Sequence, residues 1–176
     1  MYFVFRRRQN VNDTTKNHLY KRINQKDMQT QLVVTGLIFY NNKLLLIHHK
    51  KLDLWLGVGG HIEENETPDQ ALRREIKEEV GIPVQFLQPT TVGLGGETHT
   101  LCAVPFHVST HRVKDHDHCS LTYLCEAQTN QIVINKEIKG FQWVTKEELH
   151  KQEIPLDVQR IGKEAFRVYE GIKNGK

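Results

Sequence analysis

The chain has 176 residues and a formal net charge of +3, with 38% hydrophobic and 26% charged residues. This length predicts one domain with a substantial core, and the composition is ordinary for a soluble protein. The small positive charge argues against nucleic acid as a partner, and no apolar run reaches the roughly 18 residues of a membrane span. Three cysteines without C-x-x-C spacing favour a reducing cytoplasm over a disulfide framework.

The first thirty residues are polar and weakly patterned, so we expect residues 1–30 to form an N-terminal extension before a domain spanning 31–176. A short basic run lies within this extension, at Arg6, Arg7 and Arg8. We expect this run to be a solvated tail, with contact to phosphate or a membrane surface as the alternative.

Two apolar runs, 32–39 and 43–48, predict a β-hairpin whose turn is formed by Asn41 and Asn42. The first run is apolar on both faces, which indicates a buried central strand. Further strands are predicted at 84–87, 101–108, 119–126, 132–134 and 141–144. Loops are predicted at 109–118 and 135–140.

Helix signals surround the segment 68–80. Thr67 is a suitable N-cap, Pro68 fits the first helical position, and Gln70 completes a capping box. Gly81 is placed to end the helix. An apolar row for packing on the core is formed by Leu72, Ile76 and Val80. Two more helices are expected, a short one opened by the capping box at 145–148 and a final one over about 155–170.

The opposite face of the predicted helix is acidic. Glu75, Glu78 and Glu79 are spaced i, i+3, i+4, which places three carboxylates on one face. Like charges at this spacing repel, and a bound divalent cation would remove the repulsion. Because oxygen ligands without nearby cysteine select hard ions, the pattern indicates Mg²⁺ or Mn²⁺.

The segment 60–82 resembles the Nudix box, the signature G-x5-E-x7-R-E-U-x-E-E-x-G-U of the Nudix hydrolases, where U is a bulky aliphatic residue. The matching positions are Gly60, Glu66, Arg74, Glu75, Ile76, Glu78, Glu79, Gly81 and Ile82. The resemblance implies an α/β fold, the Nudix-type α/β/α sandwich with a mixed β-sheet. It also implies metal-dependent hydrolysis of a pyrophosphate bond in a nucleoside triphosphate or a nucleoside diphosphate derivative. A homodimer is compatible with the sequence.

By this resemblance, Glu75, Glu78 and Glu79 are expected to bind metal, with Glu78 or Glu79 as the alternative general base. Arg74 is expected to orient the box glutamates by ion pairing. A backbone carbonyl of Gly59 or Gly60 is expected to complete the metal site.

Residues outside the box are weaker candidates. Glu137 lies six residues before Trp143, in an arrangement seen in many family members, and is a candidate ligand or base. Candidate substrate contacts are His48, His49, Trp55, His116 and His118. Trp55 has packing as its alternative role. For the last two histidines, metal contact and a polar strand end are the alternatives.

Two other functions remain open at this point. A Nudix domain can bind a nucleotide as a regulator without hydrolysis, although degenerate boxes usually mark that class. An enzyme similar to isopentenyl diphosphate isomerase would need a catalytic cysteine outside the box. No subfamily signature in the sequence identifies the substrate.

Overall fold

The computed structural model describes residues 29–88, 96–97 and 100–175, so residues 1–28 of the expected N-terminal extension, including its basic run, lie outside the described residues. The described strands are β1 Thr30–Tyr40, β2 Lys43–His49, β3 Leu54–Leu56, β4 Val58–His61, β5 Val84–Phe86, β6 His107–Val113, β7 His116–Ala127 and β8 Ile138–Val144. The helices are α1 Pro68–Glu79, the short 3₁₀ helix η3 Glu148–His150 and α2 Leu156–Lys173. No helix in this described part of the chain is long and apolar enough to cross a membrane.

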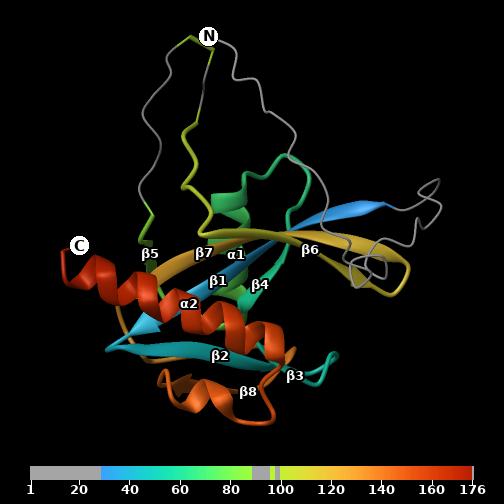
Figure 1. Ribbon diagram of the computed structural model, residues 1–176. Helices are drawn as coiled ribbons and strands as arrows, with labels where there is room; N and C mark the ends of the chain where they lie inside the picture. Colours follow the sequence, from blue (N-terminus) through green and yellow to red (C-terminus); the bar gives the residue numbers. More distant parts are fainter. Residues whose placement is uncertain (1–28, 89–95, 98–99, 176) are drawn as a thin grey trace, which may run out of the picture.

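The strands form one mixed sheet with β1 at its centre (Figure 1). β1 runs parallel to β7 along ten paired residues and antiparallel to both β2 and β4. β8 pairs with β2, whereas β5 and β6 both pair with β7. The β1–β2 turn is formed by Asn41 and Asn42, whose φ angles of 46° and 59° lie in the left-handed region. The predicted hairpin is therefore confirmed. Asparagine suits its turn, because this residue tolerates the left-handed conformation well.

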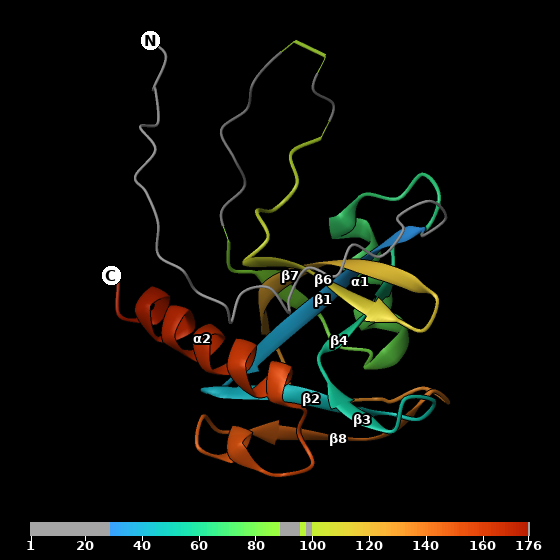
Figure 2. The ribbon, with the colours of Figure 1, turned by 45° about the vertical axis from the view of Figure 1, so that its right-hand side comes forward.

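Helices α1 and α2 lie on opposite sides of the sheet, which confirms the expected α/β/α sandwich (Figures 1 and 2). Alternation along β1 supplies both cores, because successive side chains point to opposite faces. Val34 and Ile38 pack in the core that contains α1, whereas Leu37 and Phe39 pack in the core that contains α2. Phe39 stacks on Tyr169 of α2, with ring centroids 4.2 Å apart.

The local signals for α1 are confirmed. Thr67 and Gln70 exchange both hydrogen bonds of a capping box, at 2.9 and 3.3 Å. Gly81 follows the helix with a φ of 66°, a conformation that favours glycine. The apolar row of α1, formed by Leu72, Ile76 and Val80, is buried.

The strand prediction at 101–108 and the loop prediction at 109–118 are wrong. β6 begins only at His107, and its hairpin with β7 turns at Lys114 and Asp115. The earlier apolar run does not join the sheet as an extended strand, since the N–H of Ala103 donates to the Asp69 carboxylate at 3.0 and 3.2 Å. Pro105 has no N–H with which to continue a ladder.

Two smaller differences lie near the C-terminal half. The predicted strand at 132–134 is wrong, because this segment runs beside the end of α1, where Val133 N–H donates to the Val80 carbonyl at 3.0 Å. The capping box at 145–148 is confirmed, with reciprocal bonds between Thr145 and Glu148 of 2.9 and 3.3 Å. The predicted strand at 141–144 is the second half of β8.

Candidate active site

A cleft of about 1220 Å³ opens on the sheet face beside α2. Strand alternation gives this face a polar floor, since Thr35 of β1 and Ser120 and Thr122 of β7 point into the cleft. Glu75 and Glu79 of α1 also line the cleft, together with Glu137 from the turn before β8. The structure therefore brings box carboxylates and a loop carboxylate to one cavity.

Glu79 is the buried member of this group, with 5% of its surface exposed. Its Oε2 accepts a hydrogen bond from the N–H of Gly59 at 3.1 Å, which connects α1 to β4. Burial, followed by the negative charges of Glu75, Glu137 and Glu78, raises the pKa of Glu79 from 4.5 to about 7. A carboxylate with this pKa can exchange a proton near neutral pH.

Arg74 holds the other acidic side chains of the box. Its guanidinium donates to both carboxylate oxygens of Glu66, each at 2.9 Å, and to Glu75 Oε1 at 2.8 Å. A further ion pair joins Arg74 to Glu78 at 3.5 Å. Hydrogen bonding to Arg74 lowers the pKa of Glu66, and the same bond raises the pKa of Arg74. The forked geometry explains why an arginine suits this position.

Two glycines of β4 allow the backbone to approach its neighbours closely. A Cβ atom on Gly60 would lie 2.3 Å from Glu75 Oε1, and a Cβ atom on Gly59 would lie 2.0 Å from the Val34 carbonyl oxygen. Glycine is therefore required at position 60 for Glu75 to lie against β4. Both glycines therefore allow close contact with other atoms of the protein, those of Glu75 and of β1.

Glu79 and the three carboxylates around it, those of Glu75, Glu78 and Glu137, have the chemistry of a hard-cation site. Their oxygens suit Mg²⁺ or Mn²⁺, and the negative charges of Glu75, Glu137 and Glu78 add to the effect of burial in raising the pKa of Glu79. Glu75, Glu78 and Glu79 do not form a group in which all three bring an oxygen within 4.8 Å of the other two, and the side chain of Glu78 is 56% exposed. Arg74 forms ion pairs with both Glu75 and Glu78, which directs these two carboxylates toward its guanidinium.

Glu137 and His49 lie on neighbouring segments at the cleft. The carbonyl of Glu137 accepts a hydrogen bond from Lys50 N–H at 2.8 Å, and a β-bulge between His48 and His49 shifts the pairing with β8 here. His49 Nδ1 accepts from Leu52 N–H at 3.2 Å, which leaves its Nε2 for another partner. Glu137 thus comes close enough to raise the pKa of Glu79.

His48 and Trp55, both predicted to contact substrate, lie in a different place from His49 and Glu137. Neither residue lines the cleft. Their rings stack on each other with centroids 4.9 Å apart, and His48 Nε2 lies 2.9 Å from an Asp53 oxygen. This arrangement corresponds to the packing role that was the alternative for Trp55.

A group of histidines lies at another part of the same sheet face. His116 and His118 approach His61, which is the box residue after Gly60, and His118 lines the cleft. Burial and the neighbouring His61, His111 and His116 lower the pKa of His118. Sequence reasoning missed His61 and His111, although the alternating polar pattern of Ser109, His111, His116, His118, Ser120 and Thr122 could have indicated one sheet face.

Comparison with known proteins agrees with this geometry. The family described as NUDIX domain matches residues 30–163. A hydrolase of the NUDIX family from Clostridium perfringens has a similar structure, with a TM-score of 0.72 and 28% identity over 81% of this chain and 99% of that one. The chain belongs to the NUDIX domain family, as the box predicts.

Two curated relatives resemble shorter stretches. The 8-oxo-dGTP diphosphatase of Buchnera aphidicola subsp. Schizaphis graminum is 39% identical over 56 residues, 30% of this chain and 43% of that protein. The RNA pyrophosphohydrolase of Hydrogenovibrio crunogenus is 43% identical over 65 residues, 36% of each protein. The chain therefore matches less than half the length of either relative.

Proposed function

We propose that this protein is a metal-dependent pyrophosphohydrolase that acts on a nucleoside triphosphate or on another nucleoside diphosphate derivative. The observation that carries the proposal is the position of Glu79, a buried carboxylate that lines the cleft with Glu75 and Glu137. Burial, and after it the charges of Glu75, Glu137 and Glu78, raises its pKa. Glu75, Glu79 and Glu137 line one cavity with Glu78 beside them, and like charges this close destabilise one another unless a cation joins them. The complete Nudix box is consistent with this reading.

Glu75, Glu78 and Glu79 would hold Mg²⁺ or Mn²⁺, with Glu137 as a further oxygen donor and a carbonyl of Gly59 or Gly60 beside them. Such an ion neutralises phosphate charge and lowers the pKa of bound water. Arg74 positions Glu75 through a 2.8 Å hydrogen bond and is itself anchored by Glu66. Arg74 is therefore a positioning residue in this proposal.

Glu79 is the favoured general base among the two alternatives. In that role Glu79 would leave the metal to Glu75 and Glu78, and it is held at the cleft by burial and by Gly59, whereas Glu78 is largely exposed beside Arg74. The N–H of Gly59 holds the carboxylate at 3.1 Å and fixes which oxygen remains free. Glu79 would then pass the proton to solvent or to the departing phosphate.

The rest of the cleft suits a nucleotide. Its volume of about 1220 Å³ is large enough for a nucleoside with two or three phosphates. Polar side chains of Thr122, Ser120 and His49 line the cleft and give it groups that can form hydrogen bonds. The two curated relatives carry names with different substrates, 8-oxo-dGTP and RNA, so they support pyrophosphate hydrolysis without identifying the base.

Cysteine chemistry of the isomerase type has no support in the site. All three cysteines are among the described residues, and none lines the cleft. Cys125 is buried, and burial raises its pKa to about 12, so its thiol is a poor nucleophile.

A screen tests the proposal. Phosphate and pyrophosphate release would be measured with Mg²⁺ over nucleoside triphosphates, dinucleotides and nucleotide sugars, for the wild type and for Glu79→Gln. The proposal expects turnover of at least one class, lost in the variant. Tight nucleotide binding without turnover by the wild type would instead favour the regulatory alternative.

A further inference from the structure

The histidine group formed by His61, His116 and His118 is distinct from the glutamate cluster, although His61 and His118 line the same cleft as Glu75 and Glu79. β4 alternates, so Gly60 faces Glu75 of α1 whereas the next residue, His61, faces the opposite side of the sheet. His116 and His118 lie two residues apart on β7 and share a face. The three side chains therefore meet on the far side of β4 from Glu75.

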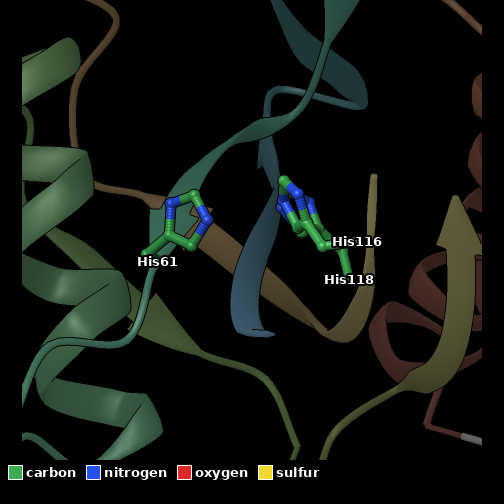
Figure 3. A group of neighbouring side chains, drawn as sticks. All are labelled: His61, His116 and His118. Atoms are coloured by element: carbon green, nitrogen blue, oxygen red, sulfur yellow. The ribbon is translucent and has the colours of Figure 1, made fainter. Parts of the chain in front are cut away.

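These rings have the spacing of metal ligands. One ligand nitrogen from each lies within 4.8 Å of the others, and His116 Nε2 is 3.0 Å from His118 Nε2. In a tetrahedral zinc site with bonds of about 2.0–2.1 Å, two ligand nitrogens are about 3.3 Å apart. Figure 3 shows a ring nitrogen of His61 pointing toward the other two rings. Small side-chain rotations would bring the three nitrogens to one ion.

Partners behind the rings support the same assignment. His116 bonds through Nδ1 to the Asp115 carboxylate at 3.1 Å, which leaves Nε2 directed at His118. A carboxylate behind a histidine is the usual outer partner of a metal-binding imidazole, because it fixes the ring and raises its basicity. His61 Nε2 is hydrogen-bonded to Gln31 Oε1 at 2.8 Å, so an ion would bind His61 through Nδ1 or would take the place of this amide.

We propose that His61, His116 and His118 form a second metal site, selective for a borderline divalent transition ion such as Zn²⁺. Imidazole nitrogens favour such ions, whereas Mg²⁺ and Mn²⁺ prefer the oxygens of the glutamate site. The ion would join β4 to β7 across the start of β1, which lies between them in the sheet. His61 is exposed and the other two are partly exposed, so an ion can enter from solvent.

The test uses the whole chain without a polyhistidine tag, treated with chelator and then titrated with Zn²⁺ or Co²⁺ in excess Mg²⁺. Excess Mg²⁺ occupies the glutamates, and the visible spectrum of Co²⁺ distinguishes tetrahedral nitrogen-rich sites from octahedral oxygen sites. We expect one bound ion per chain with a tetrahedral spectrum. Binding should weaken about 100-fold or more in His116→Ala and in His118→Ala, and about 10-fold or more in Asp115→Asn, which keeps all three rings.

His107→Ala is the matched control, because His107 lies on the same sheet face opposite Thr122 but outside the group. It should bind Zn²⁺ like the wild type, as should Glu78→Gln. A thermal melt of each metal-free variant separates loss of the site from loss of the fold, and Asp115→Asn keeps the test valid if an alanine variant unfolds. Zn²⁺ affinity that is unchanged in His116→Ala, His118→Ala and Asp115→Asn would overturn the proposal, as would a wild type that binds no Zn²⁺ in excess Mg²⁺.

Discussion

Glu79 accepts a hydrogen bond from the backbone N–H of Gly59 at 3.1 Å, so the buried carboxylate of α1 is fixed directly to β4. This contact gives the negative charge one partner inside the protein. It does not compensate for burial and for three neighbouring carboxylates, since the pKa of Glu79 remains at about 7. The site is therefore strained electrostatically when no cation is bound, and this strain can be measured.

The first prediction concerns pH and the stability of the metal-free protein. A folded-state pKa raised from 4.5 to about 7 means that the folded state binds more protons than the unfolded state between these values. Protonation of Glu79 therefore contributes to the unfolding free energy. This contribution is complete below pH 4.5 and is lost as the pH rises to about 7. In EDTA, Glu79→Gln should match the wild type near pH 4.5 and exceed its unfolding free energy by up to about 3 kcal/mol above pH 7.

Denaturant melts across this pH range provide the measurement. Comparison with Glu79→Gln cancels the contributions of histidines, which are the same in both proteins. A stability difference that does not change between pH 4.5 and 8 would show that Glu79 is not held at a raised pKa.

The second prediction concerns Gly60→Ala. The added Cβ would lie 2.3 Å from Glu75 Oε1, so Glu75 must leave its position against β4. We expect kcat to fall about 10-fold or more, since misplacement of a catalytic group is costly. Gly171→Ala in α2 is the control, because nothing lies within 4 Å of its added Cβ. Steady-state kinetics of both variants decide the point, and equal kcat values would show that the position of Glu75 is unimportant.

The third prediction concerns Arg74→Lys. Lysine keeps the charge but cannot hold Glu66 through two bonds while also reaching Glu75. We expect a loss of about 1–3 kcal/mol in unfolding free energy together with a higher Mg²⁺ requirement for activity. Arg167→Lys tests an exposed pair with Glu164 in the same way and should change stability by less than about 0.5 kcal/mol. An Arg74→Lys protein with wild-type stability and Mg²⁺ dependence would contradict the positioning role.

The fourth prediction concerns Glu137, which is exposed at the cleft and raises the pKa of Glu79. Glu137→Gln should lower kcat with little change in thermal stability, whereas Glu153→Gln, an exposed control, should change neither. Activity restored by higher Mg²⁺ would identify a ligand, because extra metal refills a weakened site but cannot replace a proton acceptor. Unchanged kcat would remove Glu137 from the mechanism.

The sequence predicts elements well where local chemistry decides the conformation. The Thr67 cap, the asparagine turn at 41–42 and Gly81 after α1 depend on near neighbours, and all are confirmed. The prediction fails where tertiary contacts decide. Ala103 N–H bonds to Asp69, 34 residues away, instead of to a strand, and Lys114 adopts a φ of 52° that its residue type does not indicate.

The same distinction applies to the site. The spacing of Glu75, Glu78 and Glu79 predicts a shared helix face, but not that Glu79 is buried under Gly59 while Glu78 is largely exposed. His48 and His49 are adjacent in sequence, yet only His49 reaches the cleft, because successive side chains of a strand point to opposite faces. The meeting of His61 with His118 depends on strand order, which no local pattern encodes.

The most direct test of the central claim is the rate of pyrophosphate-bond hydrolysis with a nucleotide substrate from the screen, measured with Mg²⁺, with excess EDTA, and in Glu78→Gln and Glu79→Gln. We predict turnover that requires Mg²⁺, disappears in EDTA and falls about 10²-fold or more in each variant while the fold survives. Undiminished turnover in excess EDTA, or near-normal kcat in both variants, would contradict the assignment of the glutamate site as the catalytic centre.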